Sequence, residues 1–322
     1  MLMELAAVVI GLLGLFWSAS KFIDGAAAVA FQLGMSPLLI GMTIVSIGTS
    51  APEILVSLMA ASTGSGGLAV GNAFGSNITN IGLVLGATLV IAPIHVGRTT
   101  VFSDLPILLG CIALCFVLLW DRSLDTRDAL MLFVGLGLVL LRLFRHAQQP
   151  DENDQSFAPS ELSARQAWVR LLVGLGILIL SSRLLVWGAS AIAFSMGVSE
   201  LVIGLTIVAI GTSLPELAAS VVSAMRGHAD IAIGAVLGSN IFNLLIVLSL
   251  PGFFSVLPLE DEAVTRDLTA VAISSATLAI ITLFCWNRQT QQARLGRRSG
   301  ALFLVFYIVY LWVLSTQPEL SL

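Results

Sequence analysis

Two glutamates stand inside long apolar stretches of the chain, where a carboxylate is costly to bury. Glu53 ends the segment G-T-S-A-P-E, and Glu216 ends the segment G-T-S-L-P-E. A carboxylate in the middle of a membrane-spanning stretch is a functional-site candidate by default, because something must compensate its charge. Protonation or an Arg partner would be the purely structural explanation, but no Lys or Arg accompanies either glutamate in these stretches. The sequence therefore favours a bound cation as the compensation.

Hydroxyl and amide oxygens surround both glutamates in the sequence. They are Thr49, Ser50, Thr212 and Ser213, followed in two G-S-N-I-x-N segments by Ser76, Asn77, Asn80, Ser239, Asn240 and Asn243. Hard cations prefer such ligands, and Ca²⁺ takes about six to eight oxygens in flexible geometry. Two carboxylates could neutralise one Ca²⁺ or most of the charge on a few Na⁺, and competition for shared ligands is a natural basis for exchange. The three cysteines lie in apolar runs and the three histidines in polar gaps, which predicts no sulfur or imidazole metal site.

The chain is a tandem duplication with a constant offset of 163 residues. This shift lays 41–60 over 204–223 with eleven of twenty positions identical, and 71–80 over 234–243 with six of ten identical. The same shift superposes Asp104 on Asp267. Generic apolar helices would match Leu and Val by chance, but not Gly, Pro, Glu and Asn at one offset.

The composition requires lipid as the surrounding solvent. Of the 322 residues, 57% are hydrophobic and 11% are charged, whereas soluble domains carry about 25% charged residues. With about 20 apolar residues for each spanning helix, we predict an all-α polytopic membrane protein with ten transmembrane helices. The expected spans are 4–31, 37–62, 68–93, 104–120, 125–144, 167–195, 200–225, 231–256, 266–286 and 299–316. The first of these lacks a basic region and a cleavage site, so we interpret it as a retained helix rather than a signal peptide.

A polar linker, 145–166, divides the spans into a first five-helix repeat, 1–144, and a second, 167–322. Because five is odd, the second repeat must be inverted, and inverted repeats are typical of secondary transporters with a site at the midplane. Pro52 and Pro215 each free the carbonyl four residues earlier, at Gly48 and Gly211. This predicts broken helices around 46–52 and 209–215, which membranes tolerate where the backbone lines a cavity.

The distribution of basic residues predicts the orientation of the chain. With the N-terminus outside, the inside loops hold ten Lys and Arg residues and the outside loops hold three. We therefore expect both termini outside and the linker in the cytoplasm. Lys21 and Arg183 remain inside helices, and Asp24 could pair with Lys21 one turn away. The net charge of −4 is too mild to indicate a nucleic-acid partner, and no protein partner is indicated.

The doubled G-T-S-x-P-E and G-S-N-I-x-N segments resemble the α-repeats of the calcium:cation antiporter superfamily, most closely its prokaryotic Na⁺/Ca²⁺ exchanger branch. The resemblance covers essentially the whole chain. It implies alternating access, in which the first and sixth helices slide as a pair, and several Na⁺ moved for each Ca²⁺. It also implies a prokaryotic cytoplasmic membrane, Ca²⁺ and Na⁺ as transported substrates, and no cofactor.

The resemblance also implies roles for individual residues. Glu53 and Glu216 would be the central ligands shared by Ca²⁺ and Na⁺, with hydroxyl and backbone oxygens added by Thr49 and Thr212. The remaining implied ligands serve the Na⁺ sites or flank the centre, and they are Ser50, Ser213, Ser76, Ser239, the carbonyls of Ser46 and Ala209, Asn80 and Asn243.

One departure from the family pattern leaves the coupling ion open. Some relatives carry Asp where this chain has Asn80 or Asn243, so this site has two strong charges rather than three. Ca²⁺/H⁺ exchange and K⁺-dependent Na⁺/Ca²⁺ exchange are the alternatives within the superfamily. The proton-coupled branch has a G-N-x-x-E motif, which Gly71 and Asn72 begin but Gly75 does not continue. From other classes, a cation channel could use the same carboxylates. An intramembrane hydrolase is disfavoured because no His lies in any span, so we expect no enzyme.

Overall fold

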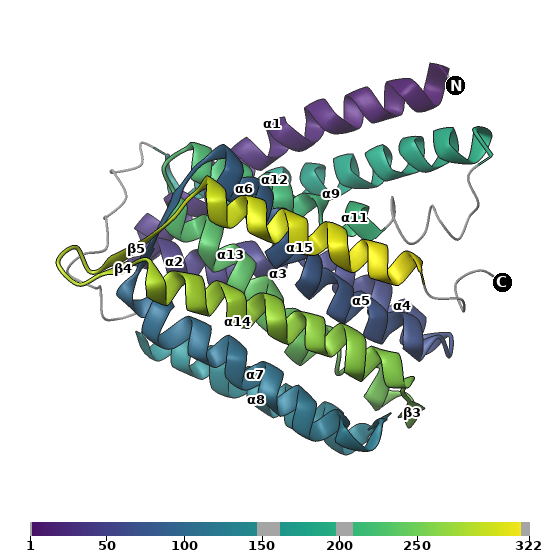
Figure 1. Ribbon diagram of the computed structural model, residues 1–322. Coiled ribbons are helices and arrows are strands. Elements are labelled where there is room, and N and C mark those ends of the chain that lie inside the picture. The colour runs from purple at the N-terminus through teal and green to yellow at the C-terminus, as the bar shows by residue number, and fades with distance from the viewer. Residues whose placement is uncertain (1, 147–161, 198–208, 317–322) are drawn as a thin grey trace.

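The computed structural model describes residues 2–146, 162–197 and 209–316, which form a helical bundle with a few very short strands (Figure 1). The expected linker falls largely outside these residues, as does the start of the expected seventh span. In the first repeat the elements are α1 (Leu2–Leu33), α2 (Pro37–Ile40), η1 (Gly41–Val45), α3 (Ser46–Thr49), α4 (Ala51–Ser62), α5 (Gly66–Thr79), η2 (Asn80–Leu85), α6 (Gly86–Ile91), β1 (Ile94–Gly97), η3 (Thr100–Asp104), α7 (Leu105–Leu118), η4 (Leu119–Asp121), β2 (Ser123–Leu124) and α8 (Thr126–His146).

The second repeat is described from α9 onward, with a gap at 198–208. Its described elements are α9 (Ala164–Ser195), α11 (Ala209–Thr212), α12 (Leu214–Met225), α13 (Ala229–Phe242), η6 (Asn243–Val247), η7 (Pro251–Phe253), β3 (Leu257–Pro258), η8 (Ala263–Leu268), α14 (Thr269–Phe284), β4 (Trp286–Asn287), β5 (Gln292–Leu295) and α15 (Arg297–Ser315). The segments η1, η2, η3, η6 and η8 are π-helical, and η4 and η7 are 3₁₀ turns.

The helices agree with the prediction of a polytopic all-α membrane protein. Within the described residues, seven helices are long and apolar enough to cross a membrane. Pro37–Thr49 and Ala51–Ser62 form an eighth span if the bent pair counts as one. α8 overlaps the fifth expected span, and α11 and α12 together cover the described part of the seventh.

α1 and α9 pack along each other at one side of the bundle, with α7 and α8 at the opposite side (Figure 1). Glycines let the two long backbones approach closely, as small residues do in membrane helix pairs. A Cβ at Gly174 would lie 2.6 Å from the amide nitrogen of Phe22, and one at Gly188 would lie 2.7 Å from the carbonyl oxygen of Glu4. Substituting either glycine would therefore separate the helices. α1 and α9 therefore form a closely packed helix pair.

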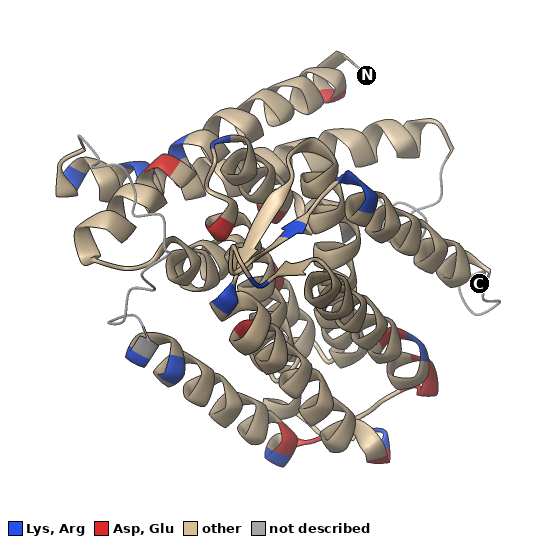
Figure 2. Cartoon of the chain, turned by 60° about the vertical axis from the view of Figure 1, so that its left-hand side comes forward, with Lys and Arg blue, Asp and Glu red and all other residues tan. Residues whose placement is uncertain are grey.

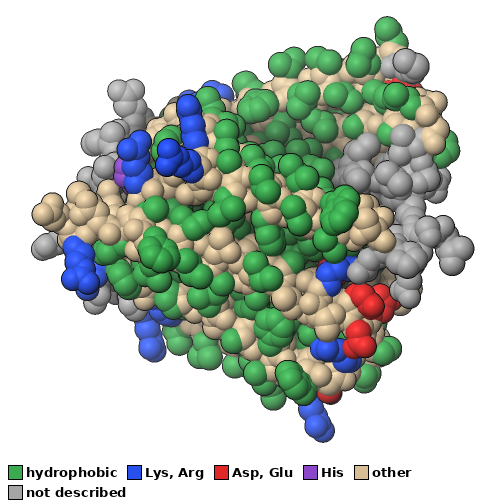
Figure 3. Space-filling model, in the orientation of Figure 1, with side chains coloured by type: hydrophobic (Ala, Val, Ile, Leu, Met, Phe, Trp, Pro, Cys, Tyr) green, Lys and Arg blue, Asp and Glu red, His purple; other side chains and the backbone are tan. Residues whose placement is uncertain are grey.

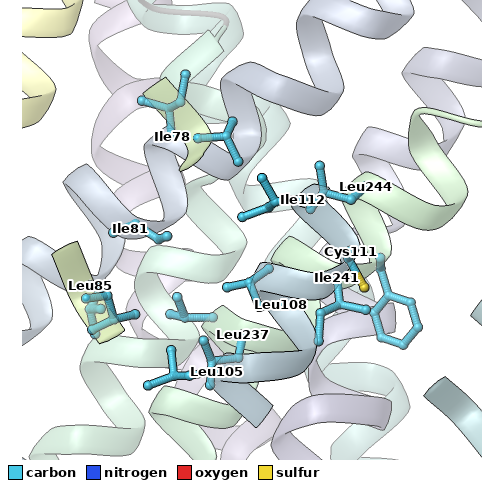
Figure 4. Packing of buried hydrophobic residues seen from close by; sticks show 14 of the residues in the cluster. Ile78, Ile81, Leu85, Leu105, Leu108, Cys111, Ile112, Leu237, Ile241 and Leu244 are labelled. Atoms are coloured by element: carbon cyan, nitrogen blue, oxygen red, sulfur yellow. The ribbon is translucent and has the colours of Figure 1, made fainter. Parts of the chain in front are cut away.

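The core lies around α13, which is the most enclosed of the long helices. In its most apolar window 94% of the residues are buried, against 28% in α1 and in α9. Figure 4 shows Leu237 and Ile241 of α13 packed among Ile78 and Ile81 of the α5–η2 helix and Leu108 of α7. The same helix also packs against α2 and η1, where Gly234 approaches the carbonyl oxygen of Leu38 (2.6 Å from a Cβ built there). Both repeats thus share one core.

The short strands were not predicted, because they are two to four residues long and lie in loops. β1, β5 and β4 form an antiparallel sheet in that order, with Ile94 opposite Leu295. β2 pairs with β3, with Leu124 opposite Leu257. The two sheets lie at opposite ends of the bundle, and each joins a loop of the first repeat to a loop of the second (Figure 1).

The surface is apolar between two polar ends. Figure 3 shows hydrophobic side chains over the middle of the face in view, with charged side chains gathered toward its ends. The turned view of Figure 2 likewise places most charged residues at helix ends and in connecting segments. Large side chains such as Phe284 and Trp312 are exposed. Such a surface is what lipid contact requires.

Asp24 does not pair with Lys21, as the helix spacing suggested. Its partner is Arg226 at the end of α12, which also donates to the carbonyl oxygen (3.4 Å) and the hydroxyl of Ser20 on α1. Burial and the adjacent charge of Arg226 lower the pKa of His228. A long-range contact between α1 and α12 thus replaces the expected local pair.

Candidate functional site

Both expected helix breaks are present, and each lies at a serine. α3 gives way to α4 at Ser50 with a bend of 46°. α11 gives way to α12 at Ser213, and both serines have a ψ near zero (4° and 5°). Each break is followed by a proline in the first turn of the next helix, where its missing N–H costs no hydrogen bond within that helix. The prediction of interruptions within 46–52 and 209–215 is confirmed.

The breaks place both glutamates in the first turn of a helix. Glu53 lies in the first turn of α4 and Glu216 in the first turn of α12, and each residue is only 1% exposed. The amino end of a helix carries a partial positive charge from its free N–H groups, which stabilises a carboxylate. The broken helices therefore supply part of the compensation that buried carboxylates need.

The two halves of the chain meet directly at these glutamates. The hydroxyl of Ser50, in the first repeat, donates a hydrogen bond of 3.2 Å to Oε1 of Glu216 in the second. Thr49 also lies beside this carboxylate. Glu53 and Glu216 are close enough for their charges to repel. A cation between them would relieve that repulsion.

The following helices contribute the expected amides and hydroxyls. Asn80 and Asn243 begin the π-helical segments η2 and η6, and both are 1% exposed. Ser76 on α5 and Ser239 on α13 are buried one turn before them. π-helical turns are rare in proteins and frequently mark functional sites. They recur at matched positions, so the same pair of side chains is buried beside a π-helical turn in each repeat.

Oxygens without a hydrogen-bond partner collect at this place. Among the described residues they include Oε2 of Glu53 and Glu216, Oδ1 of Asn80 and Asn243, and the hydroxyls of Ser213 and Ser239. Leaving a buried polar group unsatisfied costs about 1–3 kcal/mol, and more for a charged one. A bound cation would satisfy these acceptor oxygens and remove that cost, so their grouping fits a cation site. In the same described part of the chain, no three His, Cys, Asp or Glu side chains gather as a metal cluster.

The remaining expected ligands are also placed on these helices. The carbonyl of Ser46 accepts the N–H of Ser50 at 2.9 Å, and the Ser46 hydroxyl donates to the carbonyl of Thr43 at 3.2 Å. The hydroxyl of Thr49 bonds back to the carbonyl of Val45 at 3.0 Å. Thr212 ends α11, and Ala209 is its first residue. These groups lie on the backbone around the breaks.

Sequence reasoning missed the role of Asn72, which was considered only as the start of an unmatched motif. Its side-chain amide donates to the carbonyl of Glu53 (3.1 Å) and to the hydroxyl of Ser57 (2.9 Å). It thereby braces α4 against α5 directly behind the carboxylate. A polar side chain in an apolar helix, spaced one turn before Ser76, was the available signal.

The other repeat-related carboxylates serve elsewhere. Asp104 forms an ion pair with Arg142 of α8, at 3.6 Å. Asp267 is bound by Arg266 (2.7 Å) and by the hydroxyl of Tyr310 on α15 (3.0 Å). Each joins the fourth helix of its repeat to the fifth, so neither aspartate is a candidate ligand.

Comparisons with known proteins find similarity over nearly the whole chain. The family model described as "Sodium/calcium exchanger protein" matches residues 3–144 and 166–316. The chain is 43% identical over 324 residues to "Putative antiporter CaxA" of Alkalimonas amylolytica, covering 98% of this chain and 100% of that protein. It is 29% identical to "Sodium/calcium exchanger MaX1" of Methanosarcina acetivorans, covering 95% and 97%. A solved structure of the sodium-calcium exchanger NCX_Mj, soaked with Na⁺ and Sr²⁺, is similar to this chain with a TM-score of 0.84 and 30% sequence identity. The match covers 98% of this chain and 99% of that chain.

Proposed function

The chain belongs to the sodium/calcium exchanger family of membrane antiporters, and from this premise we propose that it exchanges Na⁺ for Ca²⁺ across a prokaryotic cytoplasmic membrane. A relative of 36% identity over 98% of the chain, YrbG of Escherichia coli, is named an inner membrane protein. Transport proceeds by alternating access to one central site, with Ca²⁺ and Na⁺ as competing substrates.

The observation that carries this proposal is the hydrogen bond from Ser50 to Glu216 across the two repeats, amid buried oxygens without partners. Glu53 and Glu216 are the proposed common ligands of both ions. The further proposed ligands are Thr49, Thr212, Ser50, Ser213, Ser76, Ser239, Asn80, Asn243 and the carbonyls of Ser46 and Ala209. This set contains oxygen only, which suits Na⁺ and Ca²⁺.

We propose that the ten spans form two inverted five-helix repeats, 1–144 and 167–322, joined by the cytoplasmic linker 145–166, with both termini outside. The breaks at Ser50 and Ser213, the π-helical turns beginning at Asn80 and Asn243, and the strands β1 and β3 all keep the offset of 163 residues. β1 and β3 lie at opposite ends of the bundle (Figure 1). Opposite ends for matched loops are what inversion requires.

Flux into proteoliposomes tests the function. Vesicles loaded with Na⁺ and diluted into Na⁺-free buffer should take up Ca²⁺ against its gradient. Glu53→Gln and Glu216→Gln should abolish this uptake, because each removes a charge that the cation needs. The exposed Glu260 supplies a matched control, and Glu260→Gln should leave uptake unchanged. Wild-type uptake in either site variant would refute the site.

The same vesicles separate the coupling ions. Uptake driven by a pH gradient and not by Na⁺ would show Ca²⁺/H⁺ exchange instead. A requirement for K⁺ together with Na⁺ would show the K⁺-dependent form. A channel would only dissipate a Ca²⁺ gradient, and no gradient of another ion would drive Ca²⁺ uptake against it.

A further inference from the structure

A serine on α9 is bonded to the backbone of the second broken helix. The hydroxyl of Ser182 donates a hydrogen bond of 2.8 Å to the carbonyl oxygen of Gly211, and both residues are buried. Gly211 opens the second G-T-S-x-P-E segment, five residues before Glu216. Ser182 itself belongs to neither motif, and nothing in the sequence pattern singled it out.

The Gly211 carbonyl is the one that Pro215 deprives of its helical donor. In a regular helix the N–H of residue 215 would bond to the carbonyl of residue 211, but proline has no N–H. A buried carbonyl without a partner is costly. Ser182 supplies the missing donor from another helix. The bond therefore fixes the backbone of α11 relative to α9.

α9 also touches the first broken helix through the same face. A Cβ at Gly48 would lie 2.9 Å from a methyl group of Leu175, and one at Gly211 would collide with Val186. Leu175, Ser182 and Val186 are spaced by seven and four residues, which places them on one side of a helix. This face of α9 thus contacts the opening glycine of both G-T-S-x-P-E segments.

Among the residues that the structure describes, this hydrogen bond has no counterpart in the first repeat. The offset of 163 residues matches Ser182 with Ala19 of α1, which has no hydroxyl to offer the carbonyl of Gly48. α9 therefore contacts Gly48 of the first break through apolar packing, whereas it contacts Gly211 of the second break through a directional hydrogen bond as well.

We infer that Ser182 is a positioning residue of the exchange site, acting through Gly211 on the backbone that presents Thr212 and Glu216 to the ions. This inference rests on the proposed function. The Ser182 hydroxyl donates to the Gly211 carbonyl. This bond holds the start of α12, and with it the Glu216 carboxylate, in the ligating position. Losing the bond leaves the ligands present but no longer held together. The concentrations of Ca²⁺ and Na⁺ for half-maximal exchange then rise, although every ligand is still present.

The test compares two adjacent serines. Ser182→Ala should raise the Ca²⁺ and Na⁺ concentrations for half-maximal exchange by about threefold to tenfold, the value of one buried hydrogen bond. Ser182→Thr keeps a hydroxyl and should restore them. Ser181 is the matched control, because it is equally buried on α9 but lies beside Gly14 of α1. Ser181→Ala should leave both values unchanged.

Amide hydrogen exchange supplies a readout that does not depend on transport. In ion-free protein, Ser182→Ala should speed exchange of the amides in 209–217, and Ser181→Ala should not. Equal behaviour of the two alanine variants, or unchanged half-saturation and unchanged exchange in Ser182→Ala, would overturn the inference. Wild-type protein that does not couple Na⁺ to Ca²⁺ would refute the proposed function instead, and the hydrogen-exchange comparison would still decide the role of Ser182.

Discussion

Ser50 and Ser213 hold matched positions at the two helix breaks, yet their hydroxyls have different surroundings. Ser50 donates to the Glu216 carboxylate, whereas the Ser213 hydroxyl has no hydrogen-bond partner among the described residues. Both residues are buried, at 0% and 1% exposure, so solvent replaces neither hydroxyl. We therefore predict that Ser50→Ala destabilises the ion-free protein and that Ser213→Ala does not.

The expected difference follows from the partner. A hydrogen bond to a charged group contributes about 1.5–3 kcal/mol, whereas deleting an unpaired buried hydroxyl is neutral or stabilising. At about 2–4 °C per kcal/mol for chains of 150–250 residues, Ser50→Ala should lower the apparent Tm by several degrees. Ser213→Ala should leave it unchanged or slightly higher.

Thermal unfolding in detergent, followed by tryptophan fluorescence without Na⁺ or Ca²⁺, measures this difference. A double-mutant cycle adds specificity, because Ser50→Ala should cost less when Glu216→Gln has already removed the charge. Equal Tm losses in the two serine variants would refute the asymmetry. A larger loss for Ser213→Ala would refute it as well.

Three further predictions concern charge, packing and orientation. Asn243→Asp adds a third buried carboxylate near two others, so one of them should hold a proton; Ca²⁺ uptake measured from pH 6 to 9 should become pH-dependent beyond the wild type. Gly238→Ala should lower stability by about 1–3 kcal/mol, because its Cβ would lie 2.6 Å from the Met42 carbonyl oxygen, whereas Gly110→Ala has open space and should have little effect in the same unfolding assay. A reporter fused after Arg298 should be cytoplasmic, and a periplasmic signal would show the opposite orientation.

The features that sequence could predict depend on local chemistry. Pro52 and Pro215 cannot donate to the carbonyl four residues earlier in any tertiary context, because proline lacks an N–H. The breaks were therefore predictable to within a few residues. The candidate ligands were found because buried polar side chains are rare in apolar spans, and the repeat doubled that signal.

The features that sequence could not predict depend on partners distant in the chain. Lys21 was the local candidate for Asp24, but Arg226 reaches it because α12 packs along α1. Ser182 looked like an ordinary helical serine until its bond to Gly211 became visible. The π-helical turns shift the backbone by one residue and leave no periodic mark in the sequence. In each case the determining contact is tertiary.

In the proposed exchange, the asparagines at positions 80 and 243 would determine how a membrane voltage acts on the cycle. With both glutamates ionised and two neutral amides, the empty site has a fixed charge of −2. A site loaded with one Ca²⁺ then has no net charge, so the membrane potential does no work on the loaded site when access changes sides. Loading with more than two Na⁺ leaves a net positive charge, and each such charge is worth about 2.3 kcal/mol per 100 mV. In the proposed exchange the membrane potential would therefore act on the sodium step, because positions 80 and 243 hold amides in place of carboxylates.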